Sequence, residues 1–155
     1  MRRLLLLVAL AAVALFVATA AAPVSAKGPP VATAITIHVL PTGTQTFTAT
    51  GGVVCSSGTS YDEFLSIKYG RTVNVVHVRK VLTCDDPIGS MTLLYEVRQV
   101  PDLYAEVIET GSWTVLSGTG AYAGLHGGGS EVGGYNLGGG DWIAYNLLAG
   151  KVIRG

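Results

Sequence analysis

Most of the chain after residue 30 is a series of short, β-rich segments separated by turn residues. Gly, Pro, Asn and Asp occur at most of the joins, as the ends of strands require. The segments span residues 34–40, 44–50, 63–69, 72–84, 90–100, 112–117, 130–137 and 142–148. Eight short strands in a chain of 155 residues predict an all-β domain, built either as a sandwich or as a small closed barrel.

The segment from Asp102 to Glu109 is ambiguous. Its sequence, D-L-Y-A-E-V-I-E, fits a short helical turn or a further strand, and Pro101 just before it is compatible with both. We favour a strand.

The segment 72–84 has apolar residues on both faces. Alternation places one set on one face, namely Val73, Val75 and Val81. It places the other set on the opposite face, namely Val76, Val78 and Leu82. Either a partner subunit or the C-terminal segment covers the outer face, or a β-bulge exchanges the faces midway. We expect most of the interleaved polar residues to be solvated, namely Asn74, His77, Arg79 and Lys80.

The first 26 residues have the three-part form of a secretory signal peptide. Arg2 and Arg3 precede an apolar run over 4–18, and Val24-Ser25-Ala26 has the small-x-small form of a cleavage site. Cleavage near Ala26 leaves residues 27–155 as a single secreted domain. The alternative is an uncleaved membrane anchor, because residues 4–22 are long enough to span a bilayer.

Two cysteines, Cys55 and Cys84, are the only ones in the chain. In an exported protein they predict one disulfide bond. It would close a loop of about 30 residues and stabilise the fold by about 3–4 kcal/mol. Metal binding by these cysteines would need further soft ligands nearby, and a redox pair would normally have the spacing C-x-x-C.

The charge balance argues against several classes of partner. The chain has ten basic and ten acidic residues, and without Arg2 and Arg3 the acidic residues exceed the basic ones by two. Phosphate recognition needs clustered Lys and Arg, so we expect no nucleic-acid partner. The three histidines, His38, His77 and His126, share no local spacing typical of a metal site, and we expect neither metal nor cofactor.

A glycine-rich stretch over residues 113–129 allows three interpretations. A dinucleotide-binding loop would match G-x-G-x-x-A but needs a helix immediately after it. A calcium-binding turn near Asp141 would need tandem copies. The preferred interpretation is a tight corner between curved strands, with Trp113, Tyr122 and Leu125 filling it from inside. Its structural glycines are Gly118, Gly120, Gly124 and Gly127.

The same stretch, W-x-V-x-x-G-T-G-A-Y-A-G-L-H-G-x-G, resembles the signature of the allene oxide cyclase-like and dirigent-like β-barrels, in particular small exported bacterial proteins of that group. The resemblance implies about eight antiparallel strands closing into a small β-barrel, often assembled as dimers or trimers. It also implies a mouth or cavity that admits an apolar small molecule. The matching motif is the barrel's corner and not its active site, so no catalytic residue is carried over.

The aromatic residues provide the candidates for a ligand site. Most of them would serve as core, but a pocket, if present, is expected near four residues, namely Tyr95, Trp113, Tyr122 and His126. The acid pairs Asp62-Glu63 and Asp85-Asp86 could supply paired carboxylates, but their turn-like surroundings favour solvated loop acids.

Two functions follow from these observations. The first is a secreted, non-catalytic barrel that binds a small apolar or aromatic molecule, or that assembles at the cell surface as a homo-oligomer. The alternative is an isomerase or cyclase that acts on an apolar small molecule by shape and positioning, since such enzymes need few catalytic groups.

Overall fold

The structure is a computed structural model that describes residues 28–101, 106–136 and 143–155. The predicted signal peptide and residues 102–105 of the ambiguous segment lie outside the described residues. Within the described part, no helix has the length and apolar character needed to cross a membrane.

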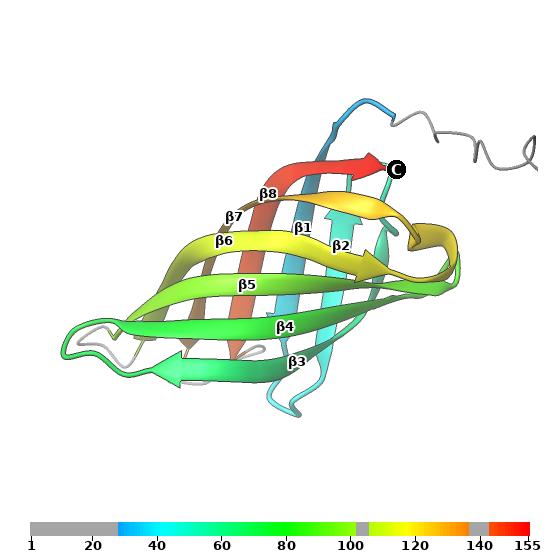
Figure 1. The fold of residues 1–155 in the computed structure, drawn as a ribbon. Coiled ribbons are helices and arrows are strands. Elements are labelled where there is room, and N and C mark those ends of the chain that lie inside the picture. Colours follow the sequence, from blue (N-terminus) through cyan, green and yellow to red (C-terminus); the bar gives the residue numbers. More distant parts are fainter. Residues whose placement is uncertain (1–27, 102–105, 137–142) are drawn as a thin grey trace, which may run out of the picture.

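Eight antiparallel strands form a closed barrel in which each strand pairs with the next and β8 pairs with β1 (Figure 1). The strands are β1 (Val31–Val39), β2 (Gln45–Thr50), β3 (Ser57–Lys68), β4 (Asn74–Cys84), β5 (Gly89–Pro101), β6 (Glu106–Gly118), β7 (Leu125–Asn136) and β8 (Ala144–Arg154). The prediction of an all-β barrel of eight antiparallel strands is confirmed, and a sandwich is excluded. Residues 106–109 belong to β6, which confirms a strand for that part of the ambiguous segment.

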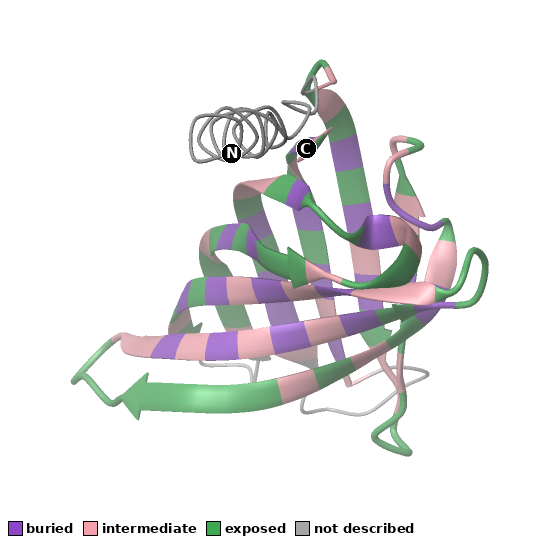
Figure 2. Cartoon of the chain, turned by 45° about the vertical axis from the view of Figure 1, so that its right-hand side comes forward, coloured by how far each residue is buried: buried purple, intermediate pink, exposed green. Residues whose placement is uncertain are grey.

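Alternation along each strand separates the lumen from the outer surface. Figure 2 shows buried bands that recur along the strands between intermediate and exposed ones. On β1, for example, Ile35 and Ile37 are fully buried while Ala34 and His38 are exposed. The barrel core is therefore made by every second residue of each strand, as a pleated sheet closed on itself requires.

Strand β4 follows one regular alternation over its whole length. Its pairing with β5 shows no register shift, and the shift in its pairing with β3 lies in β3, between Phe64 and Ser66. The inward face therefore includes Lys80 together with Val76, Val78 and Leu82, and Lys80 is 1% exposed. The expectation that the polar residues of this strand are mostly solvated is wrong for Lys80, because its parity places it in the lumen.

The glycine-rich stretch forms the predicted corner. A three-residue 3-10 turn, η1 (Gly120–Tyr122), joins β6 to β7, and Trp113, Tyr122 and Leu125 are all buried beside it. Gly120 has φ +56°, and a Cβ atom there would lie 2.6 Å from the carbonyl oxygen of Ile88. Because β7 begins at Leu125, the helix that a dinucleotide-binding loop needs is replaced by a strand.

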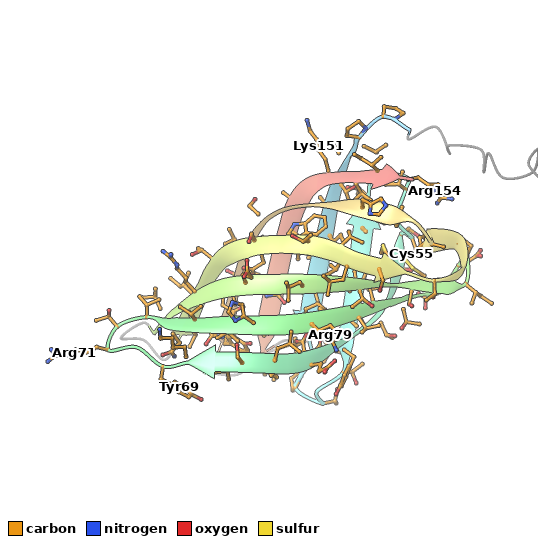
Figure 3. All side chains as sticks on the ribbon, viewed as in Figure 1. Cys55, Tyr69, Arg71, Arg79, Lys151 and Arg154 are labelled. Carbon is orange, nitrogen blue, oxygen red and sulfur yellow. A yellow bond between two sulfur atoms is a disulfide. The ribbon has the colours of Figure 1, made fainter. Side chains whose placement is uncertain are left out.

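The predicted disulfide between Cys55 and Cys84 is present. It joins the end of β4 to the segment between β2 and β3. Figure 3 shows Cys55 at one end of the barrel and Tyr69 and Arg71, in the β3–β4 hairpin, at the other. The disulfide therefore closes the chain at the end where the apolar core lies.

Strand β2 is much shorter than its neighbour β3. Residues 45–48 of β2 pair with residues 57–60 of β3, whereas β3 continues to Lys68. From Tyr61 to Lys68 the described pairing of β3 is with β4 alone. The barrel wall is therefore lower at β2, at the end of the lumen opposite the disulfide.

Candidate functional site in the barrel lumen

The lumen has an apolar end and a polar end. The apolar end contains the corner and the disulfide, and the polar end lies toward the β3–β4 hairpin. Polar side chains from seven strands meet there: Gln45, Ser60, Asp62, Lys80, Tyr95, Gln99, Glu109, Glu131, Tyr135 and Asn146. They gather because each occupies an inward position of its strand and the barrel pairing brings these positions together.

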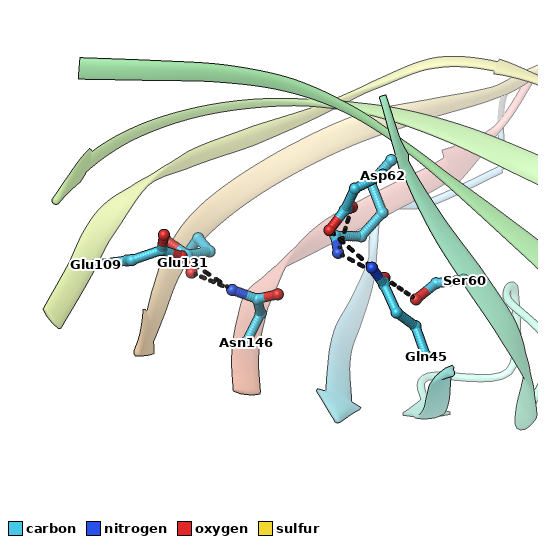
Figure 4. Close-up of polar contacts among 7 residues, drawn as sticks. Gln45, Ser60, Asp62, Glu109, Glu131 and Asn146 are labelled. Carbon is cyan, nitrogen blue, oxygen red and sulfur yellow. Dashed lines mark hydrogen bonds and ion pairs between the residues drawn. The ribbon is translucent and has the colours of Figure 1, made fainter. Parts of the chain in front are cut away.

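Two glutamates in this region share one amide donor. The Asn146 side-chain Nδ2 donates to Glu109 Oε2 at 3.2 Å and to Glu131 Oε1 at 3.0 Å (Figure 4). The three residues come from β8, β6 and β7, and all three are buried. Two carboxyl groups thus face a common neighbour in a region with little access to water.

Gly133 makes the space for this arrangement. It pairs with Glu109 on one side and with Asn146 on the other. A Cβ atom at this position would lie 2.6 Å from Asn146 Nδ2 and 2.6 Å from Glu131 Oε1. A side chain at residue 133 would therefore displace the shared amide or the carboxyl group.

Burial raises the pKa values of both glutamates, and the charge of Glu109 raises that of Glu131 further. Loss of solvation is the main cause of the raised pKa of Glu131, followed by the charge of Glu109, and together they bring that pKa to about 7. Loss of solvation also raises the pKa of Glu109, while hydrogen bonds from Gln99, Tyr135 and Asn146 act in the opposite direction. Near neutral pH the Glu131 carboxyl therefore exists in both protonation states.

Lys80 is held in a separate polar network on the opposite wall. Its Nζ lies 2.5 Å from Asp62 Oδ1 and donates to Gln45 Oε1 at 3.2 Å. Gln45 in turn donates to Asp62 Oδ2 at 3.0 Å and accepts from Ser60 at 2.8 Å (Figure 4). Nζ also lies 5.5 Å from the centroid of the Tyr95 ring. The buried charge is thus neutralised and hydrogen-bonded, as its burial requires.

Apart from Asp62 Oδ1, which forms the ion pair with Lys80, two buried polar atoms near these networks have no hydrogen-bond partner among the described residues. They are the Tyr95 hydroxyl oxygen and Glu131 Oε2. Burial is the main cause that raises the pKa of Tyr95 well above its ordinary value, so this phenol stays protonated and keeps a proton to donate. The lumen therefore offers one donor and one carboxyl oxygen to a further polar group.

A cavity of about 20 Å³ opens at this end of the lumen. Lys80, Tyr95 and Glu109 contribute its polar wall, and Phe64 and Val97 contribute apolar surface. A buried water needs about 10–15 Å³, so the enclosed space takes a water or a small polar head group. Phe64 is 56% exposed, and it forms an apolar surface outside the enclosed part.

Of the four residues predicted to lie near a pocket, the structure brings one to this cavity. Tyr95 lines it. Trp113 and Tyr122 belong to the packed core, and the Tyr122 hydroxyl donates to the Pro87 carbonyl oxygen at 3.2 Å. His126 is exposed at the start of β7. Of the three aromatic residues in that prediction, two therefore belong to the core and one lines the cavity.

The polar residues of the site were missed, although strand parity could have found some of them. Lys80 has the parity of Val76 and Val78, which marks an inward position in a chain with few inward charges. Asp62 was expected to be a solvated loop acid, but it lies within β3 and forms an ion pair with Lys80. Glu109 and Glu131 gave no signal of their own, because their proximity depends on the register between strands.

A second hollow of about 470 Å³ lies on the outer face of β4, β5 and β6. At its edge His77 Nε2 lies 3.4 Å from Glu96, and His77 Nδ1 lies 2.8 Å from the Ser66 hydroxyl. The His77 and Glu96 side chains are 39% and 59% exposed, so water screens this chain of contacts. The lumen is the stronger candidate because its charges are buried.

The part of the chain that the structure describes holds no set of three His, Cys, Asp or Glu arranged for a metal ion. No protein-family model, curated protein or solved structure matches the chain. The resemblance of residues 113–129 to the allene oxide cyclase-like and dirigent-like barrels therefore stays a prediction.

Proposed function

We propose that this protein is a binding barrel that takes the polar head group of a small molecule into the polar end of its lumen. The observation that supports this most directly is the cluster of Glu109, Glu131 and Asn146, in which Glu109 and Asn146 line the cavity and Glu131 is hydrogen-bonded to Asn146. Tyr95, whose hydroxyl has no partner among the described residues, lines the same cavity and can donate to the ligand.

The cost of burying these groups supports the proposal. An unpaired polar group in a protein interior costs about 1–3 kcal/mol, and an apolar residue of similar size would avoid that cost. The other end of the lumen is filled with apolar side chains. Ligand binding accounts for the presence of these buried polar groups, whereas packing of the lumen does not.

The polar groups of the lumen determine which ligand head group is preferred. Lys80 is already neutralised by Asp62, so the groups left to a ligand are mainly the carboxyl oxygens of Glu109 and Glu131. These accept hydrogen bonds and attract positive charge. The preferred ligand carries an amine or hydroxyl on an apolar body, with the head group in the cavity and the body against Phe64.

Three small aromatic probes test this proposal: benzylamine, benzyl alcohol and benzoate. They share one apolar body and differ in the head group. We expect benzylamine and benzyl alcohol to shift the NMR signals of Asn146 and Tyr95, with benzylamine binding more tightly as the pH rises through 7. Benzoate should shift neither signal, because the carboxyl groups repel it.

The matched variants are Glu131→Gln and Asp85→Asn, which remove a carboxyl group from the lumen and from the exposed surface, respectively. Glu131→Gln should abolish the pH dependence of benzylamine binding, whereas Asp85→Asn should leave it unchanged. Benzoate binding as tightly as benzylamine, or probe shifts confined to the outer surface, would contradict the proposal.

A second function, acid–base catalysis of an isomerisation or cyclisation, is favoured by the pKa of Glu131. A group with a pKa of about 7 can both give and take a proton at neutral pH. Turnover of an unsaturated epoxide, followed by chiral chromatography, would distinguish catalysis from binding. Activity that disappears in Glu131→Gln would support catalysis, and epoxide consumption no faster than without protein would refute it for this substrate class.

We also propose that the protein acts outside the cell. The leader-like residues 1–26 and the disulfide both fit an oxidising compartment. The mass of the protein recovered from culture supernatant tests this, since cleavage after Ala26 gives a chain that starts at Lys27.

A further inference from the structure

Among the described residues, no strand pairs with the outer backbone edge of the second half of β3. Beyond Ser60, the described pairing of β3 is with β4 alone, and it continues to Lys68. Figure 1 shows β3 reaching well beyond β2 toward the β3–β4 hairpin. Backbone N–H and C=O groups on such an edge are available to pair with another strand.

The side chains of this edge are unusually apolar for an exposed strand. Five large hydrophobic residues are exposed here, namely Tyr61 (66%), Phe64 (56%), Leu65 (43%), Ile67 (40%) and Tyr69 (77%). The remaining large exposed hydrophobics of the described chain are spread over β5, β6, β7, β8 and one turn. A concentration of this kind on a free edge marks an interaction surface.

A β-bulge determines which side chains share a face. Glu63, Ser66 and Lys68 pair with Arg79, His77 and Val75, which are alternate residues of β4. These three residues of β3 therefore lie on the outer face. Phe64 and Ile67 pair with Val78 and Val76, so they lie on the face that continues the lumen wall.

We propose that a second copy of this chain pairs with β3 through this edge, antiparallel and about a twofold axis between Leu65 and Ser66. In this register Glu63 lies opposite Lys68 of the second copy, on the outer face. Phe64 lies opposite Ile67 of the second copy, on the inner face. The twofold axis repeats both pairs, so the interface is isologous.

Charge complementarity selects both the partner and the register. A shift of two residues would place Glu63 opposite Ser66 and Lys68 opposite Tyr61, and the ion pairs would be lost. Cross-strand ion pairs and apolar pairs both stabilise antiparallel strands, and the proposed register has two of each. The edge is therefore complementary to itself, which an unrelated peptide would match only by chance.

Cross-linking tests the register. Opposed residues of antiparallel strands have Cα atoms about 4.5–5.5 Å apart, within reach of a disulfide. The double variant Glu63→Cys with Lys68→Cys should form a covalent dimer on mild oxidation. Each single variant should stay monomeric on a non-reducing gel, because identical residues lie about 15 Å apart across the axis. Equal cross-linking of a single variant would refute the register.

Sedimentation of the unmodified chain tests the dimer itself. We expect a monomer–dimer equilibrium that Ile67→Lys shifts fully to monomer, because the new charge faces Phe64 of the second copy. The control is Ile108→Lys, a similarly exposed isoleucine on β6, which should dimerise like the original chain. Circular dichroism checks that both variants are folded. If Ile67→Lys is not, Lys68→Glu provides the same test through charge repulsion.

A chain that sediments as a monomer at all concentrations would overturn the proposal, as would a dimer that Ile67→Lys leaves intact while the variant is folded. The outcome is independent of the proposed ligand, since none of these experiments uses one.

Discussion

Replacement of Glu131 by glutamine should stabilise the protein at alkaline pH and have little effect at acidic pH. The pKa of this carboxyl is raised from 4.5 to about 7 in the folded protein, mainly by burial. A raised pKa means that the folded state binds the proton more tightly than the unfolded state does. Its contribution to stability is therefore fully present below pH 4.5 and is lost as the pH rises through 7.

The size of the effect follows from the same shift. Each pH unit between the two pKa values corresponds to about 1.4 kcal/mol, so ionisation of Glu131 costs about 3 kcal/mol at pH 8. Glutamine keeps an oxygen that accepts from Asn146 and cannot ionise. We therefore expect Glu131→Gln to be about 3 kcal/mol more stable than the original chain at pH 8 and about equally stable at pH 4.

Urea denaturation followed by tryptophan fluorescence measures this difference at several pH values. Asp85→Asn is the matched control, because Asp85 is an exposed carboxyl at the other end of the barrel. Its effect on the unfolding free energy is measured at the same pH values. A stability difference for Glu131→Gln that is the same at pH 4 and pH 8, or that is larger at pH 4, would refute the reasoning.

Two further predictions concern the fold and a third concerns the candidate site. Cys55→Ala removes a cross-link over a long loop and should lower the unfolding free energy by about 3–4 kcal/mol; chemical denaturation checks this, and equal stability with and without reductant would contradict it. Gly120→Val places a branched side chain at positive φ against a carbonyl oxygen and should prevent folding, as seen by loss of the β-sheet circular dichroism spectrum. Gly133→Ala should disturb the shared amide of Asn146 and weaken benzylamine binding, whereas Gly28→Ala, which has open space around it, should leave binding unchanged.

The fold could be predicted from the sequence because its main signals are local. Turn residues separate the strands, and alternation identifies inward positions such as Ile35 and Ile37 without knowledge of pairing. The predicted boundaries of the strands were less accurate. Strand β3 begins at Ser57, six residues before the predicted start, because Gly58 and Ser60 carry little strand signal of their own. Their place is fixed by pairing with β2 and β4.

The candidate site could not be predicted in the same way. Glu109 and Glu131 are 22 positions apart in sequence, and only the pairing of β6 with β7 and of β7 with β8 brings both to Asn146. The burial of Lys80 could have been predicted, since Lys80 lies on the same face of β4 as the buried Val76 and Val78. The aromatic residues drew attention to the apolar end, where Trp113 and Tyr122 have a packing role.

The separation of the lumen into two ends has a consequence for how such a barrel can change over time. The corner, the disulfide and the large apolar side chains stabilise the chain at one end, and the polar groups and the low wall at β2 lie at the other. Selection for folding and selection for ligand choice then fall on different residues. A lineage with this architecture can exchange its polar residues and acquire new ligands while its folding remains intact.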